Sequence, residues 1–213
     1  MTDRSLRSSL HPRRLGAIAA LLASATALSA CAPLLLGGAM FGGTMMAVDR
    51  RTSGAQVEDQ GIELKGGARA REVLGGTGHV NITSYNRQVL LTGEVPSEND
   101  KAAVEAAVGR TDNIKAIVNE LAVMPNSSIG GRSNDTLITS KVKASLVDAK
   151  DLISTAFKVV TERNVVYLLG RVTEREATRA GEVASGVPGV EKVVRVFDII
   201  SEDDLAGKVR AAK

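Results

Sequence analysis

The chain has 213 residues, of which 44% are hydrophobic and 24% are charged, enough for one large domain or two small ones. It holds two histidines, one cysteine, no tryptophan and 2% aromatic residues. This composition argues against a His/Cys metal cage, which needs three or four ligands and would require every histidine and cysteine of the chain. It also excludes an intrachain disulfide, which needs two cysteines. The single cysteine, Cys31, therefore needs another explanation.

The N-terminus has the order of a secretory signal. Four basic residues precede an apolar run at 15–23, and Leu28-Ser29-Ala30-Cys31 follows; the basic residues are Arg4, Arg7, Arg13 and Arg14. The segment 28–31 resembles the bacterial lipobox, which implies that the Cys31 thiol is diacylated and the chain is cut before it. We therefore expect residues 1–30 to be a lipoprotein signal peptide and Cys31 to be the lipid attachment site. An uncleaved membrane span is disfavoured because Pro33 and several glycines interrupt the apolar stretch before about 20 residues.

Cleavage changes the charge of the chain. Removing four Arg and one Asp from 27 basic and 24 acidic residues leaves 23 of each, so the mature chain is neutral. The sequence pI of about 9.1 thus reflects the signal peptide, and we expect no nucleic-acid partner. In proteobacterial lipoproteins, which this leader resembles, Asp after the cysteine retains the protein in the inner membrane. Ala32 at that position implies the outer membrane, with the protein lipid-anchored and facing the periplasm.

Composition divides the mature chain. Residues 31–56 are expected to form the lipidated cysteine and a flexible tether, because 34–48 is apolar but broken by glycine and 49–56 is polar. Turn-forming residues at 125–133 predict a linker between two patterned regions, 57–124 and 134–201. A charged tail, 202–213, ends the chain.

The two patterned regions are internal copies. Val-Leu-Leu-Thr-Gly-Glu-Val at 89–95 aligns with Val-Tyr-Leu-Leu-Gly-Arg-Val at 166–172, an offset of 77 residues. Ala103, Ala107 and Gly109 meet Ala180, Ala184 and Gly186 at the same offset. After a slip of one residue in a turn, 114–118 aligns with 190–194. Two similar small domains are therefore expected.

The second copy predicts the order αββαβ. Ile138, Val142 and Leu146 recur at helical spacing after the cap candidates Asn134 and Asp135. Strand-like runs at 156–161 and 164–172 predict a hairpin. Thr-Glu-Arg-Glu at 173–176 predicts a capping box, followed by a helix with Ala177, Ala180 and Ala184 on one face and a last strand at 190–200.

The first copy is less regular. A hairpin at 80–95, a helix at 97–108 and a strand at 114–123 are predicted. Gly66-Gly67 and Gly75-Gly76 fall within the opening helix, which we expect to be short or loose.

Both copies resemble BON domains (bacterial OsmY and nodulation), on Val-Leu-Leu-Thr-Gly at 89–93, Val-Tyr-Leu-Leu-Gly at 166–170 and Gly-Val-Pro-Gly-Val-Glu-Lys-Val-Val at 186–194. The resemblance implies an α+β fold of two tandem BON domains, each αββαβ with a small three-stranded mixed sheet against two helices. With the lipobox, Asp-Arg-Arg-Thr at 49–52 and Ser-Asn-Asp-Thr at 133–136, the chain is similar to dual-BON outer-membrane lipoproteins. This resemblance implies a role for the chain in outer-membrane integrity, with enrichment at division sites.

The sequence offers little for catalysis. After cleavage His79 is the one histidine that remains, and the one cysteine, Cys31, carries lipid. The usual Ser-His and Cys-His nucleophile pairs are therefore not expected. The glycines at 75–78 match neither a P-loop nor a dinucleotide fingerprint. We expect no enzyme activity, no catalytic residues, no metal, no cofactor and no small-molecule substrate. His79 is interpreted as a loop or strand-edge residue, with a pH-sensitive contact as the alternative.

The first helix of the second copy offers a binding face. Leu137, Ala144 and Val147 fall opposite the core stripe, with Lys141 and Lys143 on the two flanks. Apolar residues beside lysines suit a membrane interface, but such a stripe could equally pack against the other domain or the linker. The resemblance implies binding of anionic phospholipid through this helix, with an aromatic residue at the position of Leu137.

Two other classes of function remain open. One is a protein-interaction adaptor, whose partner would be an envelope protein such as the outer-membrane barrel-assembly machinery. The other is a periplasmic stress chaperone similar to OsmY, which would act without any need for Cys31.

Overall fold

The structure, a computed structural model, describes residues 49–205. The expected signal peptide and the lipid attachment site Cys31 lie outside the described residues. Two copies of an αββαβ unit follow each other along the chain, which confirms the predicted α+β fold. Within 49–205, no helix is both long enough and apolar enough to cross a membrane.

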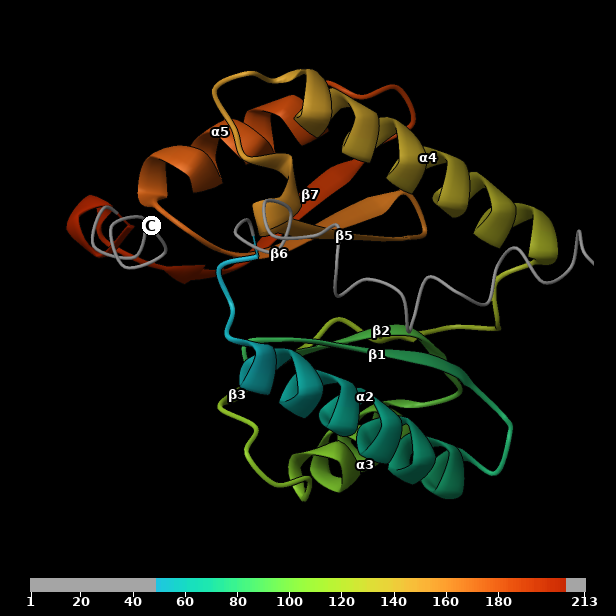
Figure 1. The fold of residues 1–213 in the computed structure, drawn as a ribbon. Coiled ribbons are helices and arrows are strands. Elements are labelled where there is room, and N and C mark those ends of the chain that lie inside the picture. The colour runs from blue at the N-terminus through green and yellow to red at the C-terminus, as the bar shows by residue number, and fades with distance from the viewer. Residues whose placement is uncertain (1–48, 206–213) are drawn as a thin grey trace, which may run out of the picture. The chain divides into compact units, whose positions relative to one another are not determined.

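The first domain has its helices on one face of a mixed sheet (Figure 1). Strand β1 (His79–Tyr85) pairs antiparallel with β2 (Gln88–Val95), and β3 (Ala116–Asn119) and β4 (Ala122–Val123) pair parallel with β2. Helices α2 (Ser53–Leu74) and α3 (Glu98–Gly109) bury their inner sides against it. The core is aliphatic and comprises Ile62, Ala70, Leu74, Val89, Leu91, Val95, Val104, Val108 and Leu121.

The second domain repeats this arrangement with a three-stranded mixed sheet. Strand β6 (Val165–Val172) lies between antiparallel β5 (Phe157–Glu162) and parallel β7 (Lys192–Ile199), with the 3-10 turn η3 (Ser154–Ala156) before β5. Helices α4 (Ile129–Asp148) and α5 (Glu174–Ser185) cover one face (Figure 1). The predicted capping box of α5, Thr173 with Glu176, is confirmed. So is the burial of Ala177, Ala180 and Ala184, whose small side chains let the helix approach the sheet closely.

The glycines of the repeated motif are required by close backbone contact. A Cβ on Gly93 would lie 2.0 Å from the carbonyl oxygen of His79, and Gly93 also has a positive φ of 115°. A Cβ on Gly170 would lie 2.6 Å from the carbonyl oxygen of Ala156. Glycine is therefore the residue that both central strands can accommodate at this register position.

Each opening helix supplies an aspartate that holds the hairpin turn of its own domain. Asp135 on α4 accepts hydrogen bonds from the backbone N–H groups of Arg163 and Asn164, each at 2.9 Å. In the first domain, Asp59 on α2 accepts those of Asn86 and Arg87, each at 2.8 Å. All four turn residues have positive φ, as both central residues of a type I′ hairpin turn must. The buried carboxylates satisfy turn N–H groups that the strands cannot.

The opening helix of the first domain is longer than the sequence predicted. We expected Gly66-Gly67 to make it short or loose, but α2 runs unbroken for 22 residues. Gly66 is buried, and a Cβ there would lie 3.4 Å from side-chain carbons of both Ile82 and Val108, so the glycine lets α2 pack closely against β1 and α3. Gly75 ends the helix in the left-handed conformation.

The expected helix starts were also too late. Residues 49–56 were predicted as a linker, yet α2 begins at Ser53, with Thr52 accepting the Ala55 N–H as N-cap. Likewise α4 begins inside the predicted linker 125–133, capped by Ser128 rather than by Asn134 or Asp135. Asp135 instead serves the hairpin turn, because its side chain lies on the buried side of the helix.

The sheet faces that the helices leave uncovered share one apolar cluster. Tyr85 and Leu90 of the first sheet pack with Tyr167, Leu169 and Val196 of the second, and all five are buried. The Tyr85 hydroxyl also donates to the carbonyl oxygen of Ala156 at 3.5 Å. The two domains therefore contact each other through their sheets.

Candidate functional site: the outer face of α4

The predicted binding residues lie together on the solvent-exposed side of α4. We call this side, formed by Leu137, Lys141, Lys143, Ala144 and Val147, the outer α4 face. All five residues are exposed, and the apolar side chains of Leu137 and Val147 are 60% and 65% exposed. The alternative, in which this stripe packs against the other domain or the linker, does not hold among residues 49–205.

Two further residues extend this face. Ile129 is 86% exposed and precedes Val147 by 18 residues, or five turns, so both point to the same side. Ile129 lies in the segment 125–133, which the sequence predicts as a linker, so it was not predicted as part of this face. The available signal was Ser128, which accepts the Gly131 N–H as N-cap of α4. Asp148 is also exposed near the C-terminal end of the face and places one negative charge there. Neither Lys141 nor Lys143 forms an ion pair with any residue of the described chain.

The inner side of α4 fixes the outer face in place. Ile138, Val142 and Leu146 are completely buried in the second core, which confirms the predicted core stripe. The Thr139 hydroxyl bonds that of Thr161 on β5 at 2.7 Å, and Asp135 holds the β5–β6 turn. The orientation of the exposed residues is therefore set by a rigid, buried surface rather than by a loop.

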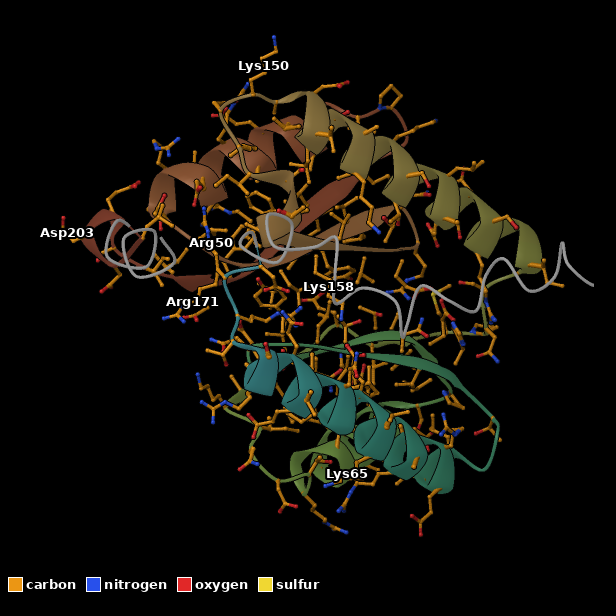
Figure 2. The ribbon with its side chains drawn as sticks, in the orientation of Figure 1. Arg50, Lys65, Lys150, Lys158, Arg171 and Asp203 are labelled. Atoms are coloured by element: carbon orange, nitrogen blue, oxygen red, sulfur yellow. The ribbon has the colours of Figure 1, made fainter. Side chains whose placement is uncertain are left out.

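The segment before α2 (Asp49–Thr52, the leading segment) contacts both domains. Arg50, labelled in Figure 2, forms two hydrogen bonds to the Glu176 carboxylate at 2.6 and 2.8 Å, and both side chains are buried. Arg51 bonds Asp59 at 2.9 Å and lies 4.2 Å from the centre of the Tyr85 ring. The Arg50 guanidinium holds the pKa of Glu176 below its usual value, although burial opposes this. The segment 49–52, predicted as part of a flexible linker, thus holds one buried arginine, Arg50, and one partly buried arginine, Arg51.

Buried carboxylates lie where the domains meet. Glu94, at the end of β2, accepts hydrogen bonds from the Ser127 hydroxyl at 2.5 Å and from Arg163 of the second domain at 3.2 Å. Burial alone would raise the pKa of Glu94, but these donors outweigh it and lower the pKa. Glu162 of β5 accepts one hydrogen bond, from Asn81 of the first domain at 3.0 Å. Burial raises the pKa of Glu162, and the charge of Glu94 adds to this.

His79 is the first residue of β1 and is partly buried. Its Nε2 lies 3.3 Å from the Asn81 amide nitrogen, so it borders the Glu162 carboxylate through Asn81. The sequence predicts His79 as a loop or strand-edge residue, and it does not point to Glu94 or Glu162. Both carboxylates lie near strand ends, and the sequence gives no signal that a second domain covers them.

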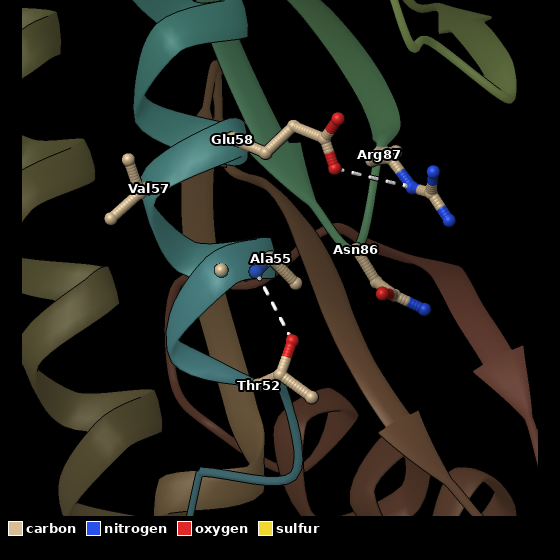
Figure 3. A pocket seen from close by; sticks show the side chains of 7 residues that line it. Thr52, Ala55, Val57, Glu58, Asn86 and Arg87 are labelled. Carbon is tan, nitrogen blue, oxygen red and sulfur yellow. Dashed lines mark hydrogen bonds and ion pairs between the residues drawn. The ribbon is translucent and has the colours of Figure 1, made fainter.

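A shallow pocket of about 520 Å³ lies at the start of α2, lined by Thr52, Gly54, Ala55, Val57, Glu58, Asn86 and Arg87 (Figure 3). Its two charged side chains face each other, with Arg87 Nε 3.5 Å from the Glu58 carboxylate. The charges within the pocket are thus already paired. In the part of the chain from Asp49 to Leu205, no three His, Cys, Asp or Glu side chains are grouped as a metal site requires.

The chain is similar to several bacterial proteins, to two of them over most of its length. It is 34% identical over 182 residues to the outer membrane lipoprotein DolP of Haemophilus influenzae, an alignment that covers 84% of this chain and 94% of that one. It is 30% identical over 159 residues to a 21 kDa hemolysin of Actinobacillus pleuropneumoniae, covering 72% and 80%. A third relative is the osmotically inducible protein Y of Escherichia coli, 34% identical over 103 residues and covering 48% and 46%.

The model of the BON domain matches the chain twice, at residues 67–125 and 134–200. The two segments begin inside α2 and inside α4 and include the strands and second helix of each unit, and each contains its motif glycine, Gly93 or Gly170. The match covers more than half of the chain. The chain therefore belongs to the BON family, as a protein with two BON domains in tandem.

Proposed function

We propose that this chain is an outer-membrane lipoprotein, anchored through Cys31 and facing the periplasm, whose second BON domain binds anionic phospholipid through the outer α4 face. The observation that carries the proposal is the exposure of Leu137 and Val147 beside two lysines on a helix whose other side is buried. The similarity to an outer membrane lipoprotein over 84% of the chain supports the anchor and the location.

The outer α4 face has the chemistry of a membrane contact. Leucine and valine gain about 25 cal/mol per Å² of apolar area removed from water, and this area is available because both side chains are exposed. Lys141 and Lys143 lie within a turn of these residues and can reach lipid phosphates, at about 1 kcal/mol for each lysine near an anionic surface. The helix would lie in the interface plane and would not insert across the bilayer.

The acyl anchor explains how a weak site can be occupied. Leucine at position 137 provides apolar area but lacks the preference of tryptophan for the interface. A lipid chain on Cys31 would keep the domain near the membrane and raise the local concentration of headgroups. The two contacts together would bind well even if the α4 contact alone is weak.

Vesicle binding tests this proposal. Residues 49–213, which contain both hydrophobic cores, are mixed with vesicles of neutral lipid or of neutral plus anionic lipid, and binding is measured by sedimentation. We expect anionic vesicles to bind more tightly, and Leu137→Glu to weaken this binding about tenfold because it removes apolar area and adds repulsion. Added salt should weaken binding as well, since the lysine contacts are exposed.

Val57→Glu is the matched control. Val57 is 69% exposed on the opening helix of the first domain, so the same substitution changes net charge equally but spares the outer α4 face. Equal binding of wild type, Leu137→Glu and Val57→Glu to both kinds of vesicle would reject the membrane face. Binding that ignores lipid composition would instead favour a protein-interaction adaptor.

We extend the proposal to a role in outer-membrane integrity, with enrichment at division sites. The resemblance to dual-BON outer-membrane lipoproteins supports it. Deletion of the gene should make cells more permeable to large antibiotics, and the full-length gene should restore the barrier. A gene with Leu137→Glu should restore it only in part, and full rescue by that variant would separate integrity from lipid binding.

A further inference from the structure

A second candidate site lies between the domains, beside α4. A cavity of about 190 Å³ is lined by His79 and Asn81 of β1, by Thr161 and Glu162 of β5, and by Arg132, Asp135, Thr136 and Thr139 of α4. No Phe, Tyr or Trp is among these residues. The cavity is thus polar and carries both signs of charge.

One wall carries a carboxylate with few partners. Glu162 is 4% exposed, and Asn81 is its one hydrogen-bond donor among the residues described. The neighbouring charges are already engaged: Arg163 bonds Glu94, and the two oxygens of Asp135 accept the turn N–H groups. A buried carboxylate with a single neutral donor is costly unless another donor or a cation joins it.

Another wall carries a guanidinium without an acceptor. The Nε of Arg132 is buried and has no hydrogen-bond partner within residues 49–205, and Arg132 takes part in no ion pair there. Arginine presents several donors in one plane and suits phosphate oxygens. The cavity therefore complements a ligand that carries an anionic group for Arg132 and a cationic group for Glu162.

We propose that this cavity binds a phosphoethanolamine group, with the ammonium at Glu162 and the phosphate at Arg132. A primary ammonium is favoured because it donates hydrogen bonds that the Glu162 carboxylate and the hydroxyls of Thr139 and Thr161 can accept. A quaternary ammonium is disfavoured because it is recognised by aromatic faces, which the lining lacks.

The choice of phosphate rests on the proposed function. Thr136, which lines the cavity, lies seven residues before Lys143, so the two share a side of α4. A membrane in contact with the outer α4 face would therefore bring headgroups close to Thr136, which lines the cavity. A free phosphoethanolamine compound would satisfy the same charges without a membrane.

A titration of the wild-type chain tests the site directly. Soluble phosphoethanolamine is added to ¹⁵N-labelled residues 49–213, with phosphate, ethanolamine and phosphocholine as separate titrants. We expect saturable shifts at the amides of Thr136, Thr139 and Glu162 with phosphoethanolamine, and at least about tenfold weaker binding of the other three. Equal effects of all four titrants, or no saturable shift, would overturn the proposal.

Variants then locate the charges. Arg132→Met and Glu162→Gln should each weaken phosphoethanolamine binding at least about tenfold, because each leaves one ligand charge unpaired. Lys150→Gln, an exposed lysine outside both the cavity and the outer α4 face, is the control and should bind as wild type. Unchanged binding by both cavity variants would place the ligand elsewhere, and the wild-type titrant series decides the question if either variant fails to fold.

Vesicle binding distinguishes a lipid headgroup from a free phosphoethanolamine compound. It also distinguishes the cavity from the outer α4 face. If neutral vesicles gain binding when phosphatidylethanolamine is added, and Glu162→Gln removes this gain, the ligand is a lipid headgroup. If the soluble compound alone binds, the site serves a free ligand. Leu137→Glu should leave the soluble titration unchanged. If the cavity does not bind phosphoethanolamine, the anionic-vesicle result still tests the outer α4 face. If anionic vesicles do not bind, the soluble titration still tests the cavity.

Discussion

At Gly170 the carbonyl oxygen of Ala156 lies 2.6 Å from the place that a Cβ would occupy, and a side-chain carbon of Val172 lies 3.3 Å from it. Ala156 is the last residue of η3 and leads directly into β5, so its backbone cannot move aside as a flexible side chain can. Gly181 in the same domain differs, since its nearest neighbour is the flexible side chain of Arg195 at 3.4 Å. Gly170 is thus required because a side chain would collide with backbone, whereas Gly181 has room for a side chain.

Gly170→Ala should destabilise the protein by about 2 kcal/mol, because the strands must separate to admit the methyl group. Gly181→Ala should be neutral or stabilising by up to about 1 kcal/mol, because alanine favours the interior of a helix. Urea unfolding of both variants beside wild type measures the two free energies. A Gly170→Ala variant as stable as wild type would show that β5 and β6 can separate at little cost.

The leading segment, residues 49–52, carries more structure than its polar composition indicates. Arg50 and Glu176 are 7% and 4% exposed at the side chain, and Glu176 also completes the capping box of α5. Arg50 therefore connects the leading segment, which precedes the first domain, to α5 of the second domain. Arg175, next to Glu176, provides a contrast, because its side chain is 60% exposed and pairs with Glu202 at 3.6 Å.

Arg50→Met should lower the free energy of unfolding by about 3 kcal/mol, since it leaves a buried carboxylate without its cation. The double variant Arg50→Met with Glu176→Gln should lose less than the sum of the two single variants. Arg175→Met should change stability by less than about 0.5 kcal/mol, because exposed pairs contribute little. If the loss of unfolding free energy in the double variant equals the sum of the two single losses, Arg50 and Glu176 act independently.

At the scale of the whole molecule, buried carboxylates set the response to acid. Donors outweigh burial and lower the pKa of Asp59 and Glu94, and Arg50 lowers that of Glu176. Each lowered pKa contributes stability above the unfolded values of 3.8 for Asp and 4.5 for Glu, and this stability is lost as pH falls through the folded pKa. Glu162 has the opposite sign, because burial raises its pKa and its ionisation above 4.5 costs stability.

Three lowered carboxylates against one raised carboxylate predict that stability falls as the pH drops below about 4. Glu94→Gln should lower the free energy of unfolding at neutral pH and make it depend less on pH in the acid range. Glu202→Gln, at an exposed ion pair, should leave the curve unchanged. The measurement is urea unfolding at a series of pH values. A Glu94→Gln curve parallel to wild type would show that Glu94 takes no part in the acid response.

The sequence by itself determined the repeat, the αββαβ order, the capping box at Thr173 and the burial of Ile138, Val142 and Leu146. Each of these rests on residues close together along the chain, where periodicity and hydrogen-bonding chemistry act locally. The same periodicity placed Leu137 and Val147 on the opposite side of the helix from the core. That side is exposed, but the sequence left open whether another domain covered it.

Only the tertiary structure decided the remaining features. It showed that Gly66 lets α2 pack closely instead of breaking it, that Asp135 holds a hairpin turn, and that Arg50 reaches Glu176. It also brought Arg132 and Glu162 to one cavity with Asn81, which is 81 residues from Glu162 in sequence. These contacts join residues distant in the chain, so their energies depend on how the sheets and helices pack, which no local pattern of residues encodes.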